Sequence, residues 1–304
     1  QSFMNKIKKI INDYNQEDKK SFFLLKFLSK ISKSKIYVSF TGLVCHFPNF
    51  DTDTNLNLWS NRIFKKKLKV KYSSSDPIMK SRHYFVALFV EKFLKKNFSF
   101  CDFGTGEGNF LIELNRIRPD GKLFFTEHSK LYFKNIINFF KKSYKKKIFG
   151  YNGSIENFNK NKLVKSIDAA SLNWTLCNCI DPLAVLKNIH KNLKSNGLLI
   201  VSESSRIMVP FKKPIYNFFN NKTKSENYHP WYFSLNSLSN ILEISGFSVK
   251  KYNRFYDEND MVIIAQKKNK LYHTPKITFD NRNKVINFLK EWKLNSDSLK
   301  NKIF

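Results

Sequence analysis

A glycine-rich turn constrains the fold of this chain more than any other feature. Residues 98–108 read FSFCDFGTGEG, with glycines at three alternate positions. This pattern is typical of a buried strand that turns tightly into a helix, with main-chain N–H groups open to a ligand. Glu127 follows about 20 residues later, where a carboxylate at the end of a second strand can accept hydrogen bonds from two ribose hydroxyls. The turn and this carboxylate together predict a cofactor that contains adenosine.

The spacing of the glycines distinguishes between two classes of adenosine cofactor. A dinucleotide-binding turn requires the pattern G-x-G-x-x-G, and the position of its last glycine is occupied by Asn109. The chain instead has G-x-G-x-G preceded by Asp102, which resembles motif I of the class I S-adenosylmethionine-dependent methyltransferases. An acidic residue before the turn suits a ligand that carries an ammonium and a sulfonium. The resemblance therefore implies S-adenosyl-L-methionine as the cofactor.

The resemblance also implies which residues surround this cofactor. They follow the carboxyl ends of the first four expected strands, because ligands of open α/β sheets bind at that edge. The residues 151–156 follow the third strand, where many relatives carry Gly-Asp and this chain has Gly153-Ser154. The expected cofactor-binding residues are Asp102, Gly104, Thr105, Gly106, Gly108, Glu127, His128, Ser154, Ile155, Asn173 and Trp174.

Short apolar segments and amphipathic segments alternate after the turn. Such repeated βα units predict a parallel sheet with helices on both faces. The last two expected strands are separated only by a short polar segment at 257–260, which favours an antiparallel hairpin. We therefore predict an α/β protein with a seven-stranded, mostly parallel, doubly wound sheet and an antiparallel terminal hairpin, as in the class I methyltransferase fold. The expected strands are 100–103, 122–127, 148–151, 167–172, 198–203, 247–252 and 261–266, and the helices between them are 109–116, 130–142 and 182–193.

The flanking segments predict three regions. Residues 1–75 are expected to form a helical and irregular cap, residues 76–267 the cofactor-binding domain, and residues 268–304 a tail with one amphipathic helix over 283–293. Within the cap, apolar residues at helical spacing predict one helix near the start and a second over the apolar block at 22–28. A helix that begins at Asp76-Pro77 is expected to carry Arg82 and His83 towards the cofactor or the substrate.

The stretch 206–234 lacks clear periodicity and contains three prolines, so we interpret it as a substrate-loop insertion. Its end, with His229 followed by Tyr232-Phe233-Ser234, resembles the substrate loop of C-methyltransferases that act on nucleotide-linked deoxysugars. Those enzymes have Glu before the histidine, where this chain has Tyr228. His229 has the pKa range of a general base, Tyr228 could orient it, and Glu203 at the end of the fifth strand is another candidate base.

Composition excludes several classes of protein. No apolar run approaches the length of a membrane span, and the first residues lack the apolar region of a signal peptide. The four cysteines have no paired spacing, so we interpret Cys177 and Cys179 as packing residues and expect no metal site and a cytoplasmic location. The net charge of +30 comes mostly from lysines spread along the chain, which favours diffuse surface charge over a nucleic-acid site.

These features together predict methyl transfer to a small or carrier-linked metabolite, with a nucleotide-linked sugar as one acceptor. Two alternatives stay open. The positive charge is compatible with an RNA methyltransferase, which would cluster lysines around the mouth of the site. The departures at Ser154 and Tyr228 are compatible with a catalytically silent partner protein that has kept only the fold.

Overall fold

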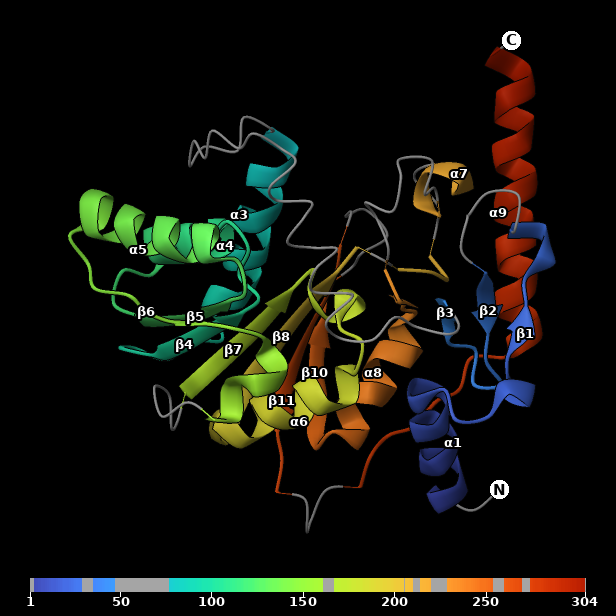
Figure 1. The fold of residues 1–304 in the computed structure, drawn as a ribbon, viewed down its shortest axis with the longest axis horizontal. Coiled ribbons are helices and arrows are strands. Elements are labelled where there is room, and N and C mark those ends of the chain that lie inside the picture. Colours follow the sequence, from blue (N-terminus) through green and yellow to red (C-terminus); the bar gives the residue numbers. More distant parts are fainter. Residues whose placement is uncertain are drawn as a thin grey trace.

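Two β-sheets organise the computed structural model of the chain, which describes residues 3–28, 35–46, 77–160, 167–204, 206–209, 214–219, 229–253, 260–269 and 274–303 (Figure 1). The larger sheet has seven strands in the order β10-β11-β8-β7-β4-β5-β6. Its strands are β4 (Ser99–Phe103), β5 (Lys122–Glu127), β6 (Phe149–Asn152), β7 (Ile167–Asn173), β8 (Leu193–Glu203), β10 (Phe247–Tyr252) and β11 (Met261–Lys267).

The pairing within the larger sheet confirms the predicted mostly parallel sheet. Strands β4 to β8 pair in parallel, whereas β11 pairs antiparallel with both β8 and β10. The chain adds β5 and β6 on one side of β4 and β7 and β8 on the other, so the strand order reverses at β4. Ligands of such sheets bind at the carboxyl ends of the strands beside this reversal. A ligand is therefore expected to bind beside the loops that follow β4 and β7.

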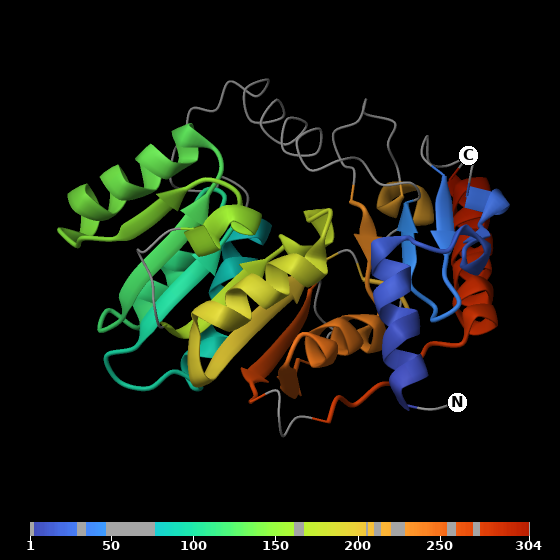
Figure 2. The same cartoon turned by 60° about the horizontal axis from the view of Figure 1, so that its bottom comes forward.

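Helices cover both faces of the larger sheet. One face packs against α3 (Pro77–Glu91), α4 (Asn109–Ile117) and α5 (Lys130–Tyr144), and the other packs against α6 (Pro182–Asn192) and α8 (Leu235–Ile244) (Figures 1 and 2). Side chains alternate between the faces along each strand, as in β8, where Ile200 points to the first face and Leu199 and Val201 point to the second. Because both faces are covered, the central strands are apolar almost throughout.

The smaller sheet combines segments that are far apart in the sequence. Its order is β1 (Phe23–Leu24), β2 (Ile36–Val38), β3 (Val44–His46) and β9 (Trp231–Tyr232), all antiparallel. The helix α9 (Arg282–Ile303) and the short α7 (Ile215–Phe218) pack on this sheet through a shared apolar cluster that includes Val38, Tyr232 and Trp292. The N-terminal segment, the end of the insertion and the C-terminal helix thus share one core. The helix α1 (Phe3–Asn15) packs against α8.

Two expectations for the flanking segments differ from the structure. The prediction of a second N-terminal helix was wrong: residues 22–28 contain the strand β1 between the single 3-10 turns Lys19–Ser21 and Lys26–Leu28. Pairing of Phe23 with Val38 in β2 decides the outcome, because a continuous apolar block is compatible with either a helix or a strand. The tail helix is confirmed but is longer than 283–293, since α9 extends over 282–303. Asp76 and most of the loop between β10 and β11 lie outside the described residues.

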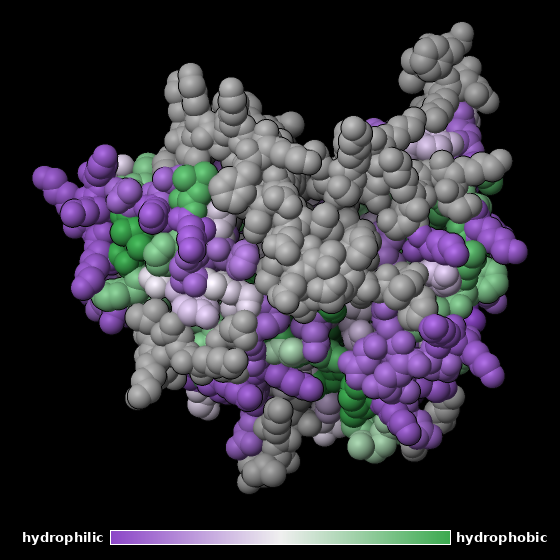
Figure 3. All heavy atoms as spheres, in the orientation of Figure 1, coloured by the Kyte–Doolittle hydropathy of each residue, from purple (hydrophilic) through white to green (hydrophobic). Residues whose placement is uncertain are grey.

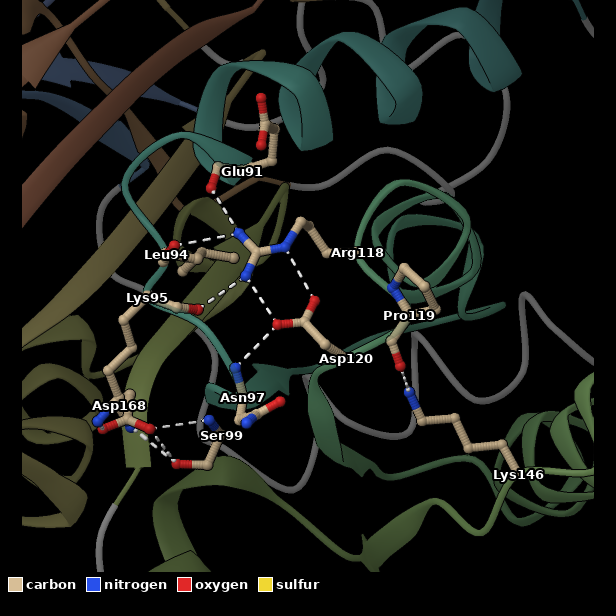
Figure 4. Close-up of polar contacts among 10 residues, drawn as sticks. All are labelled: Glu91, Leu94, Lys95, Asn97, Ser99, Arg118, Pro119, Asp120, Lys146 and Asp168. Atoms are coloured by element: carbon tan, nitrogen blue, oxygen red, sulfur yellow. Dashed lines mark hydrogen bonds and ion pairs between the residues drawn. The ribbon is translucent and has the colours of Figure 1, made fainter.

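The amino edge of the larger sheet is held by a network of charges (Figure 4). The guanidinium of Arg118 donates to the main-chain oxygens of Glu91, Leu94 and Lys95 at and just after the end of α3, and forms an ion pair with Asp120 at 2.8 Å. At the start of β7, the carboxylate of Asp168 accepts hydrogen bonds from Ser99 and from Lys95. These contacts are structural, and they leave the carboxyl edge for binding and chemistry. None of the described helices is long and apolar enough to cross a membrane.

Candidate active site

The glycine turn joins β4 to α4 and leaves an open space above Gly106. Gly104, Gly106 and Gly108 all have positive φ values, of 67°, 58° and 82°. A Cβ atom on Gly104 would lie 2.7 Å from Cγ2 of Thr175, whereas a Cβ atom on Gly106 would meet nothing within 4 Å. Gly104 therefore packs against the protein, while the main chain at Gly106 is open to a ligand.

Glu127 ends β5 beside this turn. Its Oε2 accepts a hydrogen bond from the main-chain N–H of Gly106 at 2.8 Å, and its Oε1 accepts one from Ser129 at 2.8 Å. Burial raises the pKa of Glu127 to about 7, although these two hydrogen bonds act in the opposite direction. Each carboxylate oxygen keeps a second lone pair that can accept a further hydrogen bond. The arrangement can therefore receive the two hydroxyls of a ribose.

Asp102 lies beneath the turn and connects it to β7. Its carboxylate accepts hydrogen bonds from the hydroxyl of Thr105 at 2.6 Å, the hydroxyl of Ser171 at 2.5 Å and the amide Nδ2 of Asn173 at 3.1 Å. Burial raises the pKa of Asp102 to about 6, and the three hydrogen bonds oppose this shift. The direct partners of Asp102 are thus protein groups, and its charge reaches the open space above the turn as an electrostatic field.

Two buried polar atoms near the turn favour a bound cofactor. Ser154 Oγ and Asn173 Oδ1 have no hydrogen-bond partner among the described residues. Buried polar atoms are normally paired, because leaving one unpaired costs free energy. The side chain of Ile155 packs against Gly104, and His128 is exposed on the loop after β5. The open main chain at Gly106, the lone pairs of Glu127 and these unpaired atoms fit a ligand with the polar groups of S-adenosylmethionine.

The second part of the site lies around the turn Leu176–Asn178, which follows β7. His229 Nδ1 lies 2.5 Å from Oδ1 of Asn178 and 3.7 Å from Sγ of Cys177. Asn178 Nδ2 in turn donates to the main-chain oxygen of Trp174 at 2.9 Å. Sequence reasoning found His229 but missed Asn178, because only the conformation of this turn aims the amide at the imidazole. Tyr228 lies outside the described residues.

Glu203 meets the same turn from the end of β8. Its Oε1 accepts a hydrogen bond from the main-chain N–H of Cys177 at 3.0 Å. Its Oε2 is buried and has no hydrogen-bond partner in the described part of the chain. Burial raises the pKa of Glu203 to about 7, while hydrogen bonds from Cys177 and the nearby charge of Arg82 lower it. Glu203 and His229, which are 26 residues apart in the sequence, thus both contact Cys177.

Trp174 occupies an unusual position between these two parts. Its backbone has a φ of 54°, which is rare for a bulky residue and costs of the order of 1–3 kcal/mol. Its indole N–H donates to Asp260 at 2.7 Å, and the guanidinium of Arg82 lies 3.7 Å from its ring centroid. Arg82 also pairs with Asp260 at 2.9 Å, and His83 makes an edge contact with the indole. We call Arg82, Trp174 and Asp260 the tryptophan clamp.

The smaller sheet holds the segment that carries His229. The main-chain N–H of His46 in β3 donates to the oxygen of Pro230 at 2.9 Å, and the indole of Trp231 donates to the oxygen of Cys179 at 2.7 Å. The imidazole of His46 also lies 3.1 Å from the hydroxyl of Tyr232. Burial lowers the pKa of His46 to about 4, so this ring is neutral near pH 7. His229 is therefore fixed between β3 and the turn after β7.

Comparison with protein families decides the class of protein. A family model described as a methyltransferase domain matches residues 78–252, which is more than half of the chain. The chain belongs to the methyltransferase domain family. The sheet order and the glycine turn place this methyltransferase in class I, so it is an enzyme and its cofactor is S-adenosylmethionine. A comparison with curated proteins finds no match.

Solved structures support the same fold for this methyltransferase. A candidate O-methyltransferase from Nostoc punctiforme PCC 73102 is 15% identical, and the alignment covers 71% of this chain and 68% of that one with a TM-score of 0.50. An O-methyltransferase family protein from Burkholderia thailandensis is 12% identical, with coverage of 63% and 57% and a TM-score of 0.50. At these identities the likeness concerns the fold.

Proposed function

We propose that this methyltransferase methylates a small or carrier-linked metabolite whose acceptor atom loses a proton in the reaction. The observation that carries the proposal is the convergence of Glu203 and His229 on Cys177. Two groups that can accept a proton thus lie at the carboxyl ends of β7 and β8, while the glycine turn and Glu127 lie at the ends of β4 and β5. The cofactor and the acceptor would occupy neighbouring parts of one edge.

The residues on the cofactor side have separate tasks in this proposal. When bound, S-adenosylmethionine supplies a methyl group that leaves its sulfur for the acceptor. The carboxylate of Glu127 holds the ribose, the absence of a side chain at Gly106 lets the ligand approach the turn, and Ser154 and Ile155 contact the adenine. Asp102 favours the cationic end of the ligand through its field and holds the turn in place through Thr105.

The acceptor side aligns the acceptor and removes a proton from it. Methyl transfer requires the acceptor to be aligned, so most of the catalytic effect comes from positioning. The imidazole of His229 accepts the proton of the acceptor, as a general base whose ordinary pKa lies near neutrality. Glu203 Oε2 binds a polar hydrogen of the acceptor, because this buried oxygen has no hydrogen-bond partner among the described residues.

Two acceptor classes satisfy this chemistry. The likeness of the sequence around His229 and Tyr232-Phe233-Ser234 to sugar C-methyltransferases favours a nucleotide-linked sugar, which would lose a proton from carbon. The similar solved structures from Nostoc and Burkholderia are described as O-methyltransferases, which supports testing hydroxyl acceptors as well. Both classes need a base, whereas a simple cofactor-binding protein does not.

Single-turnover transfer of a labelled methyl group from S-adenosylmethionine tests the proposal, with nucleotide-linked deoxysugars and phenols as acceptors. We expect His229→Gln to slow transfer by about 10²–10⁴-fold, which is the usual contribution of a general base. Its affinity for S-adenosylhomocysteine, measured by calorimetry, should be unchanged. The matched control is His190→Gln near the end of α6, just before β8 begins, where the histidine contacts the oxygen of Lys268. Full activity of His229→Gln would refute the role of the base.

The net charge of +30 supports one second candidate, an RNA acceptor. Hydrophilic residues occur over several separate regions of the face seen in Figure 3, including α5 and α1, so the visible surface does not single out one binding patch. An RNA acceptor would give methyl transfer to a tRNA transcript that weakens steeply as salt rises. Transfer to a neutral phenol that is insensitive to salt would exclude it.

A further inference from the structure

We infer that Asn178 and the tryptophan clamp are positioning residues that hold His229 with its proton on Nδ1 and its lone pair on Nε2. The inference rests on the proposed function, since it describes how the base of that reaction is kept ready. It concerns residues that sequence analysis did not connect with His229, namely Asn178, Arg82 and Asp260. Four contacts run in sequence from Arg82 on α3 to the imidazole of His229.

The first step is the amide of Asn178, which has a different partner at each end. Its Nδ2 donates to the main-chain oxygen of Trp174 at 2.9 Å, so its Oδ1 is the atom that faces His229. An amide oxygen can only accept a hydrogen bond. His229 Nδ1, at 2.5 Å, must therefore be the donor, and in the neutral imidazole the lone pair lies on Nε2.

The same geometry explains why asparagine suits this position better than aspartate. Aspartate would place a carboxylate oxygen against the oxygen of Trp174, and two acceptors in contact repel each other. It would also add a negative charge beside an imidazole, which favours the imidazolium form and removes the lone pair of the base. Asparagine satisfies both neighbours and leaves the imidazole neutral.

The second step is the conformation of Trp174, whose main-chain oxygen accepts the hydrogen bond from Asn178. A φ of 54° is unfavourable for tryptophan and persists only where the surroundings impose it. The tryptophan clamp does so: Asp260 accepts from the indole at 2.7 Å, and Arg82 both pairs with Asp260 and stacks on the ring. The main-chain N–H of Trp174 also donates to the oxygen of Ser202 at 2.7 Å. The strained residue is thus fixed on three sides.

The consequence is a link between the helix beside the glycine turn and the base on the acceptor side. Arg82 belongs to α3, which packs against α4 directly after the turn. The groups that face this chain of contacts are Glu203 and Cys177 from the acceptor side and Asp260 beside β11. A perturbation of α3 or of Asp260 should therefore reach the imidazole through Trp174 and Asn178.

Nitrogen NMR of the full chain, labelled in its six histidines and free of cofactor and acceptor, tests the inference directly. Correlations between the ring protons and the ring nitrogens report which nitrogen of each imidazole carries the proton, and the signal missing from His229→Gln assigns His229. We expect Nδ1–H in the wild type. Asn178→Leu should lower the ratio of Nδ1–H to Nε2–H by about tenfold, which is the scale of one neutral hydrogen bond.

Matched substitutions separate positioning from general loss of structure. Asn192→Leu removes a similar bond, from an amide to the main-chain oxygen of Asn188, within α6 and should leave His229 unchanged. Trp174→Phe removes the donor to Asp260 and should lower the ratio in part, whereas Trp292→Phe in the core of the smaller sheet should not. If Asn178→Leu fails to fold, Asn178→Asp keeps an acceptor at Oδ1 but adds a negative charge, so both ring nitrogens of His229 should keep their protons to a higher pH than in the wild type. An unchanged titration of the ring would contradict the contact between residue 178 and Nδ1.

A wild-type proton on Nε2, or an unchanged ratio in Asn178→Leu, would overturn the inference. These results are distinct from failure of the proposed function. Normal methyl transfer by His229→Gln would refute the base while leaving the measured tautomer intact. A wrong tautomer together with an inactive His229→Gln would keep the base and refute the positioning.

Discussion

Replacing Glu203 with Gln should show how much the buried carboxylate destabilises the fold near neutral pH. Burial raises the pKa of Glu203 from its usual value of 4.5 to about 7 in the folded chain. Between these two values the folded state keeps a proton that the unfolded state has released. The free energy of unfolding of the wild type is therefore not reduced by this group at low pH, and it falls as the pH rises from 4.5 towards 7.

The magnitude follows from the two pKa values. One pKa unit corresponds to about 1.4 kcal/mol, so the full penalty approaches about 3 kcal/mol above pH 7. The substituted glutamine would keep an oxygen for the main-chain N–H of Cys177 but would not titrate. The new amide group also changes the free energy of unfolding, by an amount that does not depend on pH. The free energy of unfolding of Glu203→Gln relative to wild type should thus rise by about 2–3 kcal/mol between about pH 5 and about pH 8.

Urea unfolding of the cofactor-free chain across this pH range measures the difference. The control is Asp120→Asn at the opposite edge of the sheet, where the hydrogen bond from Arg118 holds the pKa of the carboxyl well below its usual range (Figure 4). Asp120 is ionised in both states above about pH 5, so the deficit of this variant should be constant there. Parallel pH profiles for wild type and Glu203→Gln would refute the reasoning, because the carboxyl would then titrate alike in both states.

Three further variants test the cofactor side and the smaller sheet. Because burial raises the pKa of Glu127 to about 7, the affinity for S-adenosylhomocysteine, measured by calorimetry, should increase as the pH rises through that value. Glu127→Gln should lose this increase near pH 7 and keep only the contribution of Asp102, whose pKa is about 6. Gly106→Ala should weaken the affinity for S-adenosylhomocysteine by about tenfold or more, because it places a methyl group in the open space and strains a backbone with a φ of 58°. The control Gly42→Ala, whose new Cβ would collide with Asp280, should lower only the free energy of unfolding. Tyr232→Phe removes the contact with His46 and should cost about 1 kcal/mol in urea unfolding, and an unchanged midpoint would contradict this hydrogen bond.

The larger sheet could be predicted from the sequence because its signals are local. Each strand is an apolar segment bounded by a turn, and each helix begins or ends at a recognisable residue, as α6 begins at Asp181-Pro182. The antiparallel hairpin followed from the short spacing between the last two strands. These signals do not depend on partners that are distant in the sequence, which is why the predicted and observed elements agree closely there.

The smaller sheet could not be predicted, because its order depends on pairings across most of the chain. The strand β9 contains only Trp231 and Tyr232, which is about the shortest length a strand can have. It pairs with β3, which lies far earlier in the sequence. The block at 22–28 likewise contains the strand Phe23–Leu24, and no helix, because β2 was available to pair with it. A short apolar segment does not specify its partner, so tertiary contacts decide its conformation.

The location of the candidate site could be predicted from the sequence, but the hydrogen bonds among its side chains could not. The rule that ligands bind at the carboxyl ends of parallel strands selected Glu127, Glu203 and the loop after β7. It could not show that Asn178 faces the imidazole of His229, because that contact depends on the left-handed backbone of Trp174. Nothing in the sequence marks a tryptophan as left-handed, since its conformation is imposed by Asp260 and Arg82.

Each of the two sheets positions a different part of the proposed active site. The larger sheet places the glycine turn and Glu203, but the segment with His229 reaches this edge only because β3 pairs with β9 and the indole of Trp231 bonds to the oxygen of Cys179. Loss of the smaller sheet should therefore leave cofactor binding intact and displace His229, the proposed base. In the proposed function the smaller sheet therefore belongs to the acceptor site, and its sequence should limit which acceptors fit.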